Sequence, residues 1–410
     1  MTQRNHLRAL TGVACVLMAL STHAVAEEVE PDLLTFAQGA LPISIATGEN
    51  DLRVKMDKAI AMIDGNPRGF SALGKPAVDG DFVEVVFELP AETLFHRFAV
   101  PNITETPSAY QTFFRTVEIW GSAETSDDGY TLLASGRLST HAEDGLSTEL
   151  TLTEDQPEVR WIRMRLSGGI KIEAEKTFLE FSEIIGNGTQ APREPSDQFD
   201  GIWRGRGVKI ELAQDGVTVS GCYDNNGRLS GTVDGNILRA VGENDAGIGS
   251  QFILLADAEG DFQGLRSTNG APFKPYNGEV SDRAPVCKPP EPPKLGCGSI
   301  IHGIGFDYDS DALREESWPV IDALFSGLSA ETAEAIEIVG HSSSEGAADY
   351  NRDLSRRRAQ SVATALVDLG IDPTKLLASG RGEDEPIASN DDEAGRSLNR
   401  RVEIKCSEAE

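Results

Sequence analysis

One stretch near the carboxyl end, residues 335–370, constrains the fold of this chain more than any other. Residues 335–339 form an apolar run that alternates for most of its length and stops at Gly340, which predicts a strand that ends in a loop. A polar segment follows, and the pattern then predicts a helix over residues 349–369, with Gly370 at the position of a C-cap glycine. The apolar residues that recur at helical spacing are Leu354, Val362, Leu366 and Leu369.

Arginines gather in the first turns of this predicted helix. Arg358 lies one turn after Leu354 and one turn before Val362, so its guanidinium is expected at the edge of the apolar stripe, close to the loop. A strand, a polar loop and a helix that begins with arginine form a natural receptor for an anion. Arg356 and Arg357 are interpreted as a solvated basic face, whereas the position of Arg358 favours binding.

The flanking segments complete a domain over residues 297–410. The pattern predicts four further elements, and these are a strand at 299–306, a helix at 313–328 and strands at 376–379 and 401–404. The resulting order βαβαββ predicts an α+β sandwich with both helices on one face of the sheet.

This domain resembles the OmpA-like domains, which hold an outer-membrane or periplasmic protein to peptidoglycan. The resemblance runs from about Ile300 to Ile404 and consists of five blocks in the right order. The blocks are Gly-Phe-Asp-Tyr-Asp-Ser at 305–310, Gly-His at 340–341, Tyr-Asn-Arg-Asp-Leu-Ser-Arg-Arg-Arg-Ala at 350–359, Gly-Arg-Gly-Glu-Asp-Glu-Pro-Ile at 380–387 and Gly-Arg-Ser-Leu-Asn-Arg-Arg-Val-Glu at 395–403.

The resemblance implies a site for the diaminopimelate residue of the peptidoglycan stem peptide. That ligand offers an ammonium and a carboxylate close together, so its receptor needs a carboxylate and a planar guanidinium. Carried over by position, the carboxylate-binding arginine is Arg358, a second arginine is Arg400, and a polar residue after the first strand is Asp309.

One position departs from the family pattern. The usual loop reads Gly-His-Thr-Asp, and its aspartate holds the ammonium, but the matching residue here is the uncharged Ser343. A hydroxyl accepts a hydrogen bond yet loses much of the electrostatic attraction. Glu345 or Asp349 could supply the missing charge from nearby. The alternatives are weaker binding or preference for a stem peptide with a different third residue.

The first 26 residues have the features of a secretory signal peptide. Arg4 and Arg8 precede an apolar stretch over residues 9–20, and small residues at 24–26 offer a cleavage site. No other stretch approaches the roughly 18 apolar residues of a spanning helix. The expected location is therefore outside the cytoplasm: in the periplasm or at the inner face of the outer membrane, associated with the cell wall.

Export permits disulfides. Cys15 belongs to the predicted signal peptide and is not expected to carry lipid, which leaves Cys222, Cys287, Cys297 and Cys406. Three pairings are possible, and Cys222–Cys287 with Cys297–Cys406 is favoured because each pair would close one domain. The four thiols lack Cys-x-x-Cys spacing, so a metal site is not expected. No cofactor of another kind is expected either.

Residues 27–190 show the period-two alternation of an all-β sandwich, with strands separated by Asp-Gly and Gly-Gly turns. The region resembles a discoidin-type, galactose-binding-like jelly roll, which implies a loop-borne site for a sugar, lipid or protein of the envelope. The matching segments are residues 62–67, 87–90, 117–122, 160–166 and 181–186. The alternative is an outer-membrane β-barrel of the porin type with the same anchor. Such a barrel needs an apolar, lipid-facing band with aromatic girdles. Aromatic residues are only 6% of the chain and several candidate outward faces carry Glu, which disfavours the barrel.

Between the two end domains lies a glycine-rich region, residues 199–287. Asp-Gly and Asn-Gly turns recur in it, which predicts a meander of hairpins forming a small all-β sheet or barrel. Residues 191–198 are interpreted as a linker. Residues 288–296 are a second, proline-rich linker, expected to be a stiff spacer that holds the last domain away from the rest.

The formal charge of −29 argues against nucleic-acid binding. His341 beside three serines is the one segment that suggests a hydrolase, but no Gly-x-Ser-x-Gly elbow, phosphate loop or zinc-binding helix is present. The sequence thus predicts a non-catalytic protein that grips peptidoglycan and presents a β-rich module to an envelope ligand. A cell-wall hydrolase is the remaining alternative.

Overall fold

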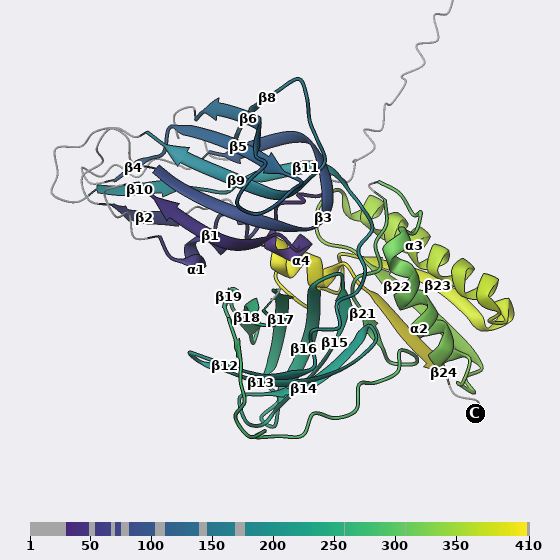
Figure 1. The fold of residues 1–410 in the computed structure, drawn as a ribbon. Helices are drawn as coiled ribbons and strands as arrows, with labels where there is room; N and C mark the ends of the chain where they lie inside the picture. The colour runs from purple at the N-terminus through teal and green to yellow at the C-terminus, as the bar shows by residue number, and fades with distance from the viewer. Residues whose placement is uncertain are drawn as a thin grey trace, which may run out of the picture.

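The computed structural model describes residues 30–48, 54–66, 70–74, 82–102, 111–138, 146–168, 177–257, 259–307 and 309–407. The predicted signal peptide, including Cys15, lies outside these residues. Within them, no helix combines the length and the apolar character that crossing a membrane requires. The fold is mostly β-sheet and ends in an α+β domain (Figure 1).

The N-terminal part contains an eight-stranded sheet in the order β1-β3-β9-β5-β6-β8, with β7 and β11 paired to β3, and a three-stranded sheet in the order β2-β10-β4. Its elements are η1 (Phe36–Gln38), β1 (Leu41–Thr47), α1 (Met56–Ile60), β2 (Phe70–Gly74), β3 (Phe82–Pro101), β4 (Gln111–Phe113), β5 (Thr116–Ser122), β6 (Thr131–Arg137), β7 (Ser147–Glu149), β8 (Thr151–Leu152), β9 (Val159–Ser167), β10 (Thr177–Phe181) and β11 (Ile185–Gln190).

Alternation along β3 explains its burial. Val83, Val85 and Phe87 are fully buried, while Glu84 between them is partly exposed and faces Arg163 and Arg165 of β9. Phe181 of the smaller sheet belongs to the same apolar core, so one core serves both sheets. The discoidin-type identity stays a prediction.

The middle part is a nine-stranded antiparallel sheet in the order β19-β18-β17-β16-β15-β14-β13-β12-β20. Its strands are β12 (Gly201–Gly205), β13 (Val208–Asp215), β14 (Thr218–Tyr223), β15 (Gly227–Asp234), β16 (Ile237–Asn244), β17 (Gly249–Ala256), β18 (Phe262–Thr268), β19 (Lys274–Pro275) and β20 (Glu279–Val280). Consecutive strands pair as hairpins, and the turn glycines Gly216 and Gly235 adopt φ of 56° and 57°, a conformation that glycine reaches without strain.

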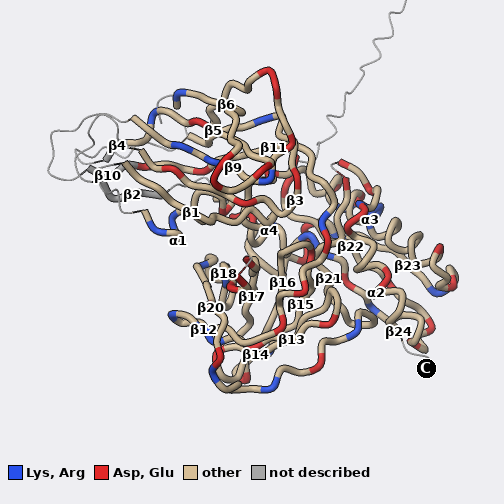
Figure 2. Tube along the Cα trace, in the orientation of Figure 1, with Lys and Arg blue, Asp and Glu red and all other residues tan. Residues whose placement is uncertain are grey.

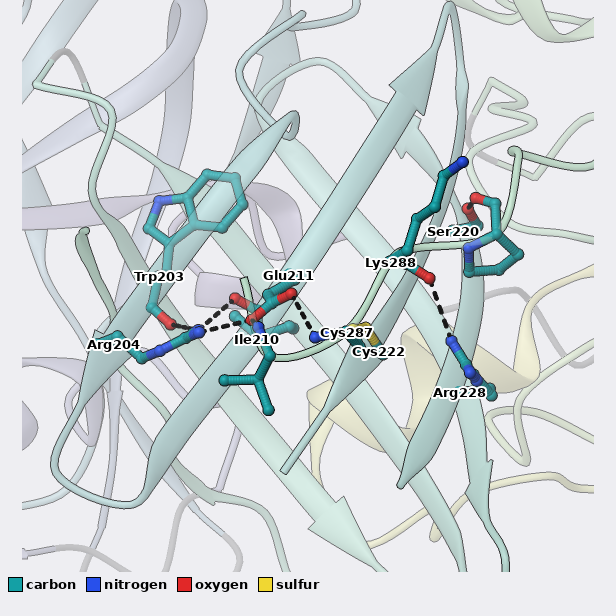
Figure 3. Close-up of a disulfide and its surroundings, with 11 residues drawn as sticks. Trp203, Arg204, Ile210, Glu211, Ser220, Cys222, Arg228, Cys287 and Lys288 are labelled. Carbon is teal, nitrogen blue, oxygen red and sulfur yellow. Dashed lines mark hydrogen bonds and ion pairs between the residues drawn. A yellow bond between two sulfur atoms is a disulfide. The ribbon is translucent and has the colours of Figure 1, made fainter. Parts of the chain in front are cut away.

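The proline-rich linker does not act as a spacer, which corrects the prediction for residues 288–296. The backbone carbonyl of Lys288 accepts a hydrogen bond from Arg228 at 3.4 Å, and Ser220 donates one to the carbonyl of Pro290, so the first part of the linker lies along β14 and β15 (Figure 3). Cys287, at its start, is disulfide-bonded to Cys222. A polyproline segment leaves its carbonyls unpaired, and polar strand residues can therefore hold it.

Both disulfides join the cysteines favoured from the sequence. Cys222 pairs with Cys287 at a Cα–Cα distance of 6.6 Å, and Cys297 pairs with Cys406 at 5.5 Å. Glu211 lies close to the first pair, but it accepts hydrogen bonds from the backbone amides of Val286 and Cys287, and oxidised sulfurs are poor metal ligands. The disulfide and Glu211 therefore fix the residues just before the linker to strands β13 and β14.

The C-terminal part contains a four-stranded sheet in the order β21-β24-β22-β23. Its elements are β21 (Ile300–Ile301), η2 (Glu315–Ser317), α2 (Trp318–Leu328), β22 (Ala335–His341), α3 (Ala348–Leu369), η3 (Pro373–Lys375), β23 (Leu376–Gly382), α4 (Glu393–Asn399) and β24 (Val402–Ser407). The predicted order βαβαββ is wrong at one point, because α4 intervenes between the last two strands. Asp392 starts this helix as its N-cap and accepts a hydrogen bond from the amide of Gly395 at 2.8 Å.

Helix α4 is the point at which all three parts meet (Figure 1). Ala394 and Leu398 of α4 are buried in the same apolar cluster as Leu34 of the N-terminal part and Ile253 of the middle part. Arg314, before η2, also donates a hydrogen bond to the carbonyl of Gln190. The three parts are therefore packed on one another rather than separated.

Candidate functional site

The site begins where β22 delivers its loop to α3. Helix α3 lies directly on the strand at this point, because a Cβ on Gly340 would stand 2.1 Å from the carbonyl oxygen of Ser355. Only glycine permits this close approach. The contact fixes the position of the polar loop against the first turns of the helix.

Arg358 lies where the sequence places it, half-buried on α3. Its Nε donates a hydrogen bond to the carbonyl of Ser310 at 3.0 Å, and its guanidinium carbon lies 5.0 Å from the centre of the Phe306 ring. The aromatic face and the carbonyl fix the plane of the guanidinium, which suits two-pronged recognition of a carboxylate.

Asp309 contacts the beginning of helix α3. It adopts a left-handed φ of 47°, and its carboxylate accepts a hydrogen bond from the hydroxyl of Tyr350 in the first turn of α3. Asp309 therefore connects the segment after β21 to the helix that carries Arg358.

Ser343 and Glu345 of the loop form a second group with Arg400, the residue that follows α4. The Ser343 hydroxyl donates to Oε2 of Glu345 at 3.0 Å, and Nη1 of Arg400 lies 3.4 Å from Ser343 Oγ and 3.3 Å from Glu345 Oε2. A carboxylate thus stands beside the serine that replaces the family aspartate. Asp349, the other candidate for this charge, does not join the group, since its side chain is fully exposed and pairs with Arg352 at 3.2 Å.

Sequence reasoning missed two members of this group, Glu393 and Arg396 of α4. Glu393 accepts hydrogen bonds from Arg396 at 2.9 Å and from Arg400. Burial alone would raise the pKa of Glu393, but the charges of Arg400 and Arg396 outweigh it and hold that pKa below its usual value. The signal that could have revealed α4 is the capping residue Asp392 three positions before Gly395.

His341 is a buried residue that lies next to an acidic side chain. Its side chain is buried, and its Nε2 lies 3.5 Å from a carboxylate oxygen of Glu403. The adjacent His341 imidazole, and then the hydrogen bonds from Arg401, hold the pKa of Glu403 well below its usual value. In the part of the chain that the structure covers, no hydrogen bond joins the imidazole to a serine hydroxyl, so a serine–histidine pair is not assembled.

Arg358 and Glu345 open onto a cavity of about 800 Å³ between the three parts of the chain. The N-terminal part contributes the wall opposite α3, and the middle part contributes Asp234 and Arg239. Residues of the N-terminal wall include Glu30, Asp32, Arg97, Asn102, Ser147 and Asn187.

Buried carboxyl groups lie in and beside this wall, since Asp32 and Glu183 line the cavity and Asp64 is close to them. Burial raises the pKa of Asp32 to about 7, against hydrogen bonds from the amides of Gly186 and Leu34. Burial likewise raises the pKa of Asp64 to about 7. The pKa of Glu183 is raised by burial and then by the nearby charges of Asp32 and Asp64. These three acids lie where the N-terminal part meets α4.

Comparison with known proteins places the similarity in the C-terminal part. Residues 305–400 match the OmpA family. Over 127 residues the chain is 39% identical to outer membrane protein A of Bordetella avium, covering 30% of this chain and 66% of that protein. Over 100 residues it is 34% identical to the peptidoglycan-associated lipoprotein of Pseudomonas aeruginosa, covering 24% of this chain and 59% of that protein.

Among solved structures, the peptidoglycan-associated lipoprotein from Burkholderia pseudomallei is 28% identical, with a TM-score of 0.24, over 25% of this chain and 88% of that one. The chain spans two thirds or less of the length of the two curated relatives. The sequence match shows that residues 305–400 form an OmpA family domain.

Proposed function

We propose that this chain is an exported envelope protein that binds peptidoglycan non-covalently through its C-terminal domain. The observation that carries the proposal is the setting of Arg358, whose guanidinium lies over Phe306, donates to Ser310 and belongs to a residue that lines a cavity. The name of the Pseudomonas aeruginosa relative, a peptidoglycan-associated lipoprotein, supports the same ligand.

The chemistry of the site fits a diaminopimelate side chain. Arg358 would receive its carboxylate in a charge-assisted pair of hydrogen bonds, and Glu345 would attract its ammonium in place of the usual aspartate. Glu345 already faces Arg400 and Arg396, so part of its charge is compensated before the ligand arrives. Binding weaker than that of a site with the family aspartate is therefore part of the proposal.

The proposal includes a bridging role without catalysis. The N-terminal β-rich module, proposed to be a discoidin-type sandwich, would meet a glycan, lipid or protein of the envelope while the C-terminal domain holds the cell wall. The location that follows is the periplasm or the inner face of the outer membrane. Incubation with purified muropeptides is expected to release no fragments, and release of fragments would favour the hydrolase alternative.

Co-sedimentation with purified sacculi tests the proposed function. The chain is expected to sediment with sacculi that contain diaminopimelate and to be released by an excess of the free tripeptide L-Ala-γ-D-Glu-meso-diaminopimelate. Sedimentation that the tripeptide does not reverse would place the contact outside the proposed site, and absence of sedimentation would refute the proposal.

Restoring the family charge gives a gain-of-binding prediction. Ser343→Asp places a carboxylate beside Arg400 and the position of the ligand ammonium, so we expect tripeptide affinity to be retained or to rise by up to about tenfold, as for a hydrogen bond to a charged group. Isothermal titration calorimetry measures the change. Ser344→Asp, at the exposed neighbouring position, adds the same charge outside the site and is the control. A clear loss of affinity in Ser343→Asp alone would contradict the assigned place of the ammonium.

A further inference from the structure

The cavity at Arg358 is lined by the N-terminal part as well as by the C-terminal domain, and the N-terminal part also covers α4. A Cβ on Gly65 would stand 2.1 Å from Cβ of Glu393, and Arg396 lies 3.5 Å from the carbonyl oxygen of Gly65. A peptide held by Arg358 inside this cavity would therefore have residues of the N-terminal wall available as further partners.

Basic residues from all three parts line this cavity, although the chain as a whole carries a formal charge of −29. Figure 2 shows blue and red segments together where β3, β22 and α4 converge. The arginines that line the cavity include Arg97, Arg193, Arg239, Arg358, Arg396 and Arg400.

Most of these guanidiniums are committed to buried acids. Arg193 and Arg239 share Asp234 at 2.9 and 3.4 Å, and all three side chains are at least nine-tenths buried. Arg396 and Arg400 share Glu393, whose side chain is 11% exposed. An anionic ligand could bind these arginines only by breaking a buried ion pair, which is costly.

Arg97 on β3 is different. Its carboxylate partner, Glu149, is 57% exposed and lies outside the cavity lining, while the Arg97 side chain is 37% exposed and lines the cavity. The pair is two-pronged, because Nε of Arg97 donates to Oε2 of Glu149 at 3.0 Å and Nη2 donates to Oε1, so a ligand carboxylate has to displace Glu149. The displaced carboxylate is more than half exposed and returns to water, which makes this exchange less costly than breaking one of the buried pairs. Nη1 of Arg97 also donates to Oδ1 of Asn187 at 2.7 Å, which orients the guanidinium without neutralising it.

We propose that Arg97 is a second carboxylate-binding residue of the site, so that the N-terminal part completes a composite receptor for a peptide with several acid groups. This inference rests on the proposed function and adds the class of ligand that the site would recognise, a peptide with more than one carboxylate. A stem tripeptide carries further carboxylates beyond the acid group that Arg358 would hold. The cavity volume of about 800 Å³ lies within the range of about 300–1,000 Å³ typical of ligand sites.

The test compares two probes on the full chain by calorimetry: free meso-diaminopimelate and the tripeptide L-Ala-γ-D-Glu-meso-diaminopimelate. Wild type is expected to prefer the tripeptide. Arg97→Ala is expected to lose about tenfold in tripeptide affinity and thereby most of that preference, and Arg97→Lys is expected to recover part of it.

Arg165→Ala is the matched control. Arg165 is also an arginine of the N-terminal sheet, 41% exposed and paired with a glutamate at 3.8 Å, but it lies outside the cavity lining. The Arg165→Ala variant should bind both probes as wild type does. Equal tripeptide affinities for wild type and Arg97→Ala would overturn the composite site while leaving Arg358 in place. Failure of the proposed function itself is distinguishable, because Arg358→Ala would then bind both probes as wild type does.

Discussion

Replacing Arg358 by alanine is expected to weaken binding of the diaminopimelate tripeptide by about 100-fold and to abolish co-sedimentation with sacculi. The variant removes a half-buried guanidinium that is aligned by Phe306 and Ser310. Truncating one partner of a buried, hydrogen-bonded charge pair costs about 2–5 kcal/mol, which corresponds to roughly 30-fold to several thousand-fold, and the half-buried setting of Arg358 favours the lower part of this range. Calorimetry with the tripeptide gives the affinity directly.

Arg356→Ala is the matched control for this prediction. Arg356 lies on the same helix two positions earlier, is 55% exposed and pairs only with Asp353 among the ion pairs seen, so its loss should leave affinity unchanged. Arg358→Lys should recover only part of the binding, because an ammonium cannot form the two parallel hydrogen bonds of a guanidinium. Wild-type affinity in Arg358→Ala would remove the assignment, as would an equal loss in Arg356→Ala.

Stability is expected to fall as the pH rises from about 5 to 8. Asp32 and Asp64 have pKa values raised to about 7 in the folded chain, against about 4 when unfolded. The folded state therefore binds protons that the unfolded state has released, so this contribution is fully present below about pH 4 and is lost as the pH rises through about 7. Between these two pH values, each carboxyl lowers the free energy of unfolding by up to about 1.4 kcal/mol for every unit by which the pH rises.

Urea denaturation at pH 5 and pH 8 measures this dependence. Asp32→Asn and Asp64→Asn together should make it less steep, since an amide oxygen can still accept the hydrogen bonds from Leu34, Gly186 and Asn66 but cannot ionise. The remaining slope is expected from Glu183, whose pKa is also raised. Asp127→Asn, an exposed position, should leave the slope as it is in wild type. A wild-type slope in the double variant would show that these acids do not govern the pH response.

The strand, loop and helix around Arg358 could be predicted because each carries its own local signal. Alternation ends at Gly340, a helical stripe runs to Leu369, and α3 indeed spans Ala348–Leu369. A residue at the edge of such a stripe has to lie half-buried, as Arg358 does. Local periodicity was sufficient for this half of the site.

The other half depends on contacts that no local pattern encodes. Helix α4 has seven residues, fewer than two full turns of clear periodicity, so it was missed together with Glu393 and Arg396. The cavity depends on packing between parts of the chain far apart in sequence, such as Gly65 against Glu393. Periodicity indicates which face of an element is buried, but it does not indicate which surface covers that face. For the same reason the proline-rich linker was expected to separate domains that are in fact packed together.

A crystal structure of the chain with the bound tripeptide tests the central claim most directly. We predict that the diaminopimelate carboxylate lies in the plane of the Arg358 guanidinium within hydrogen-bonding distance, with its ammonium beside Glu345. A tripeptide bound elsewhere, with Arg358 still donating to the Ser310 carbonyl and lying over the Phe306 ring, would contradict the account.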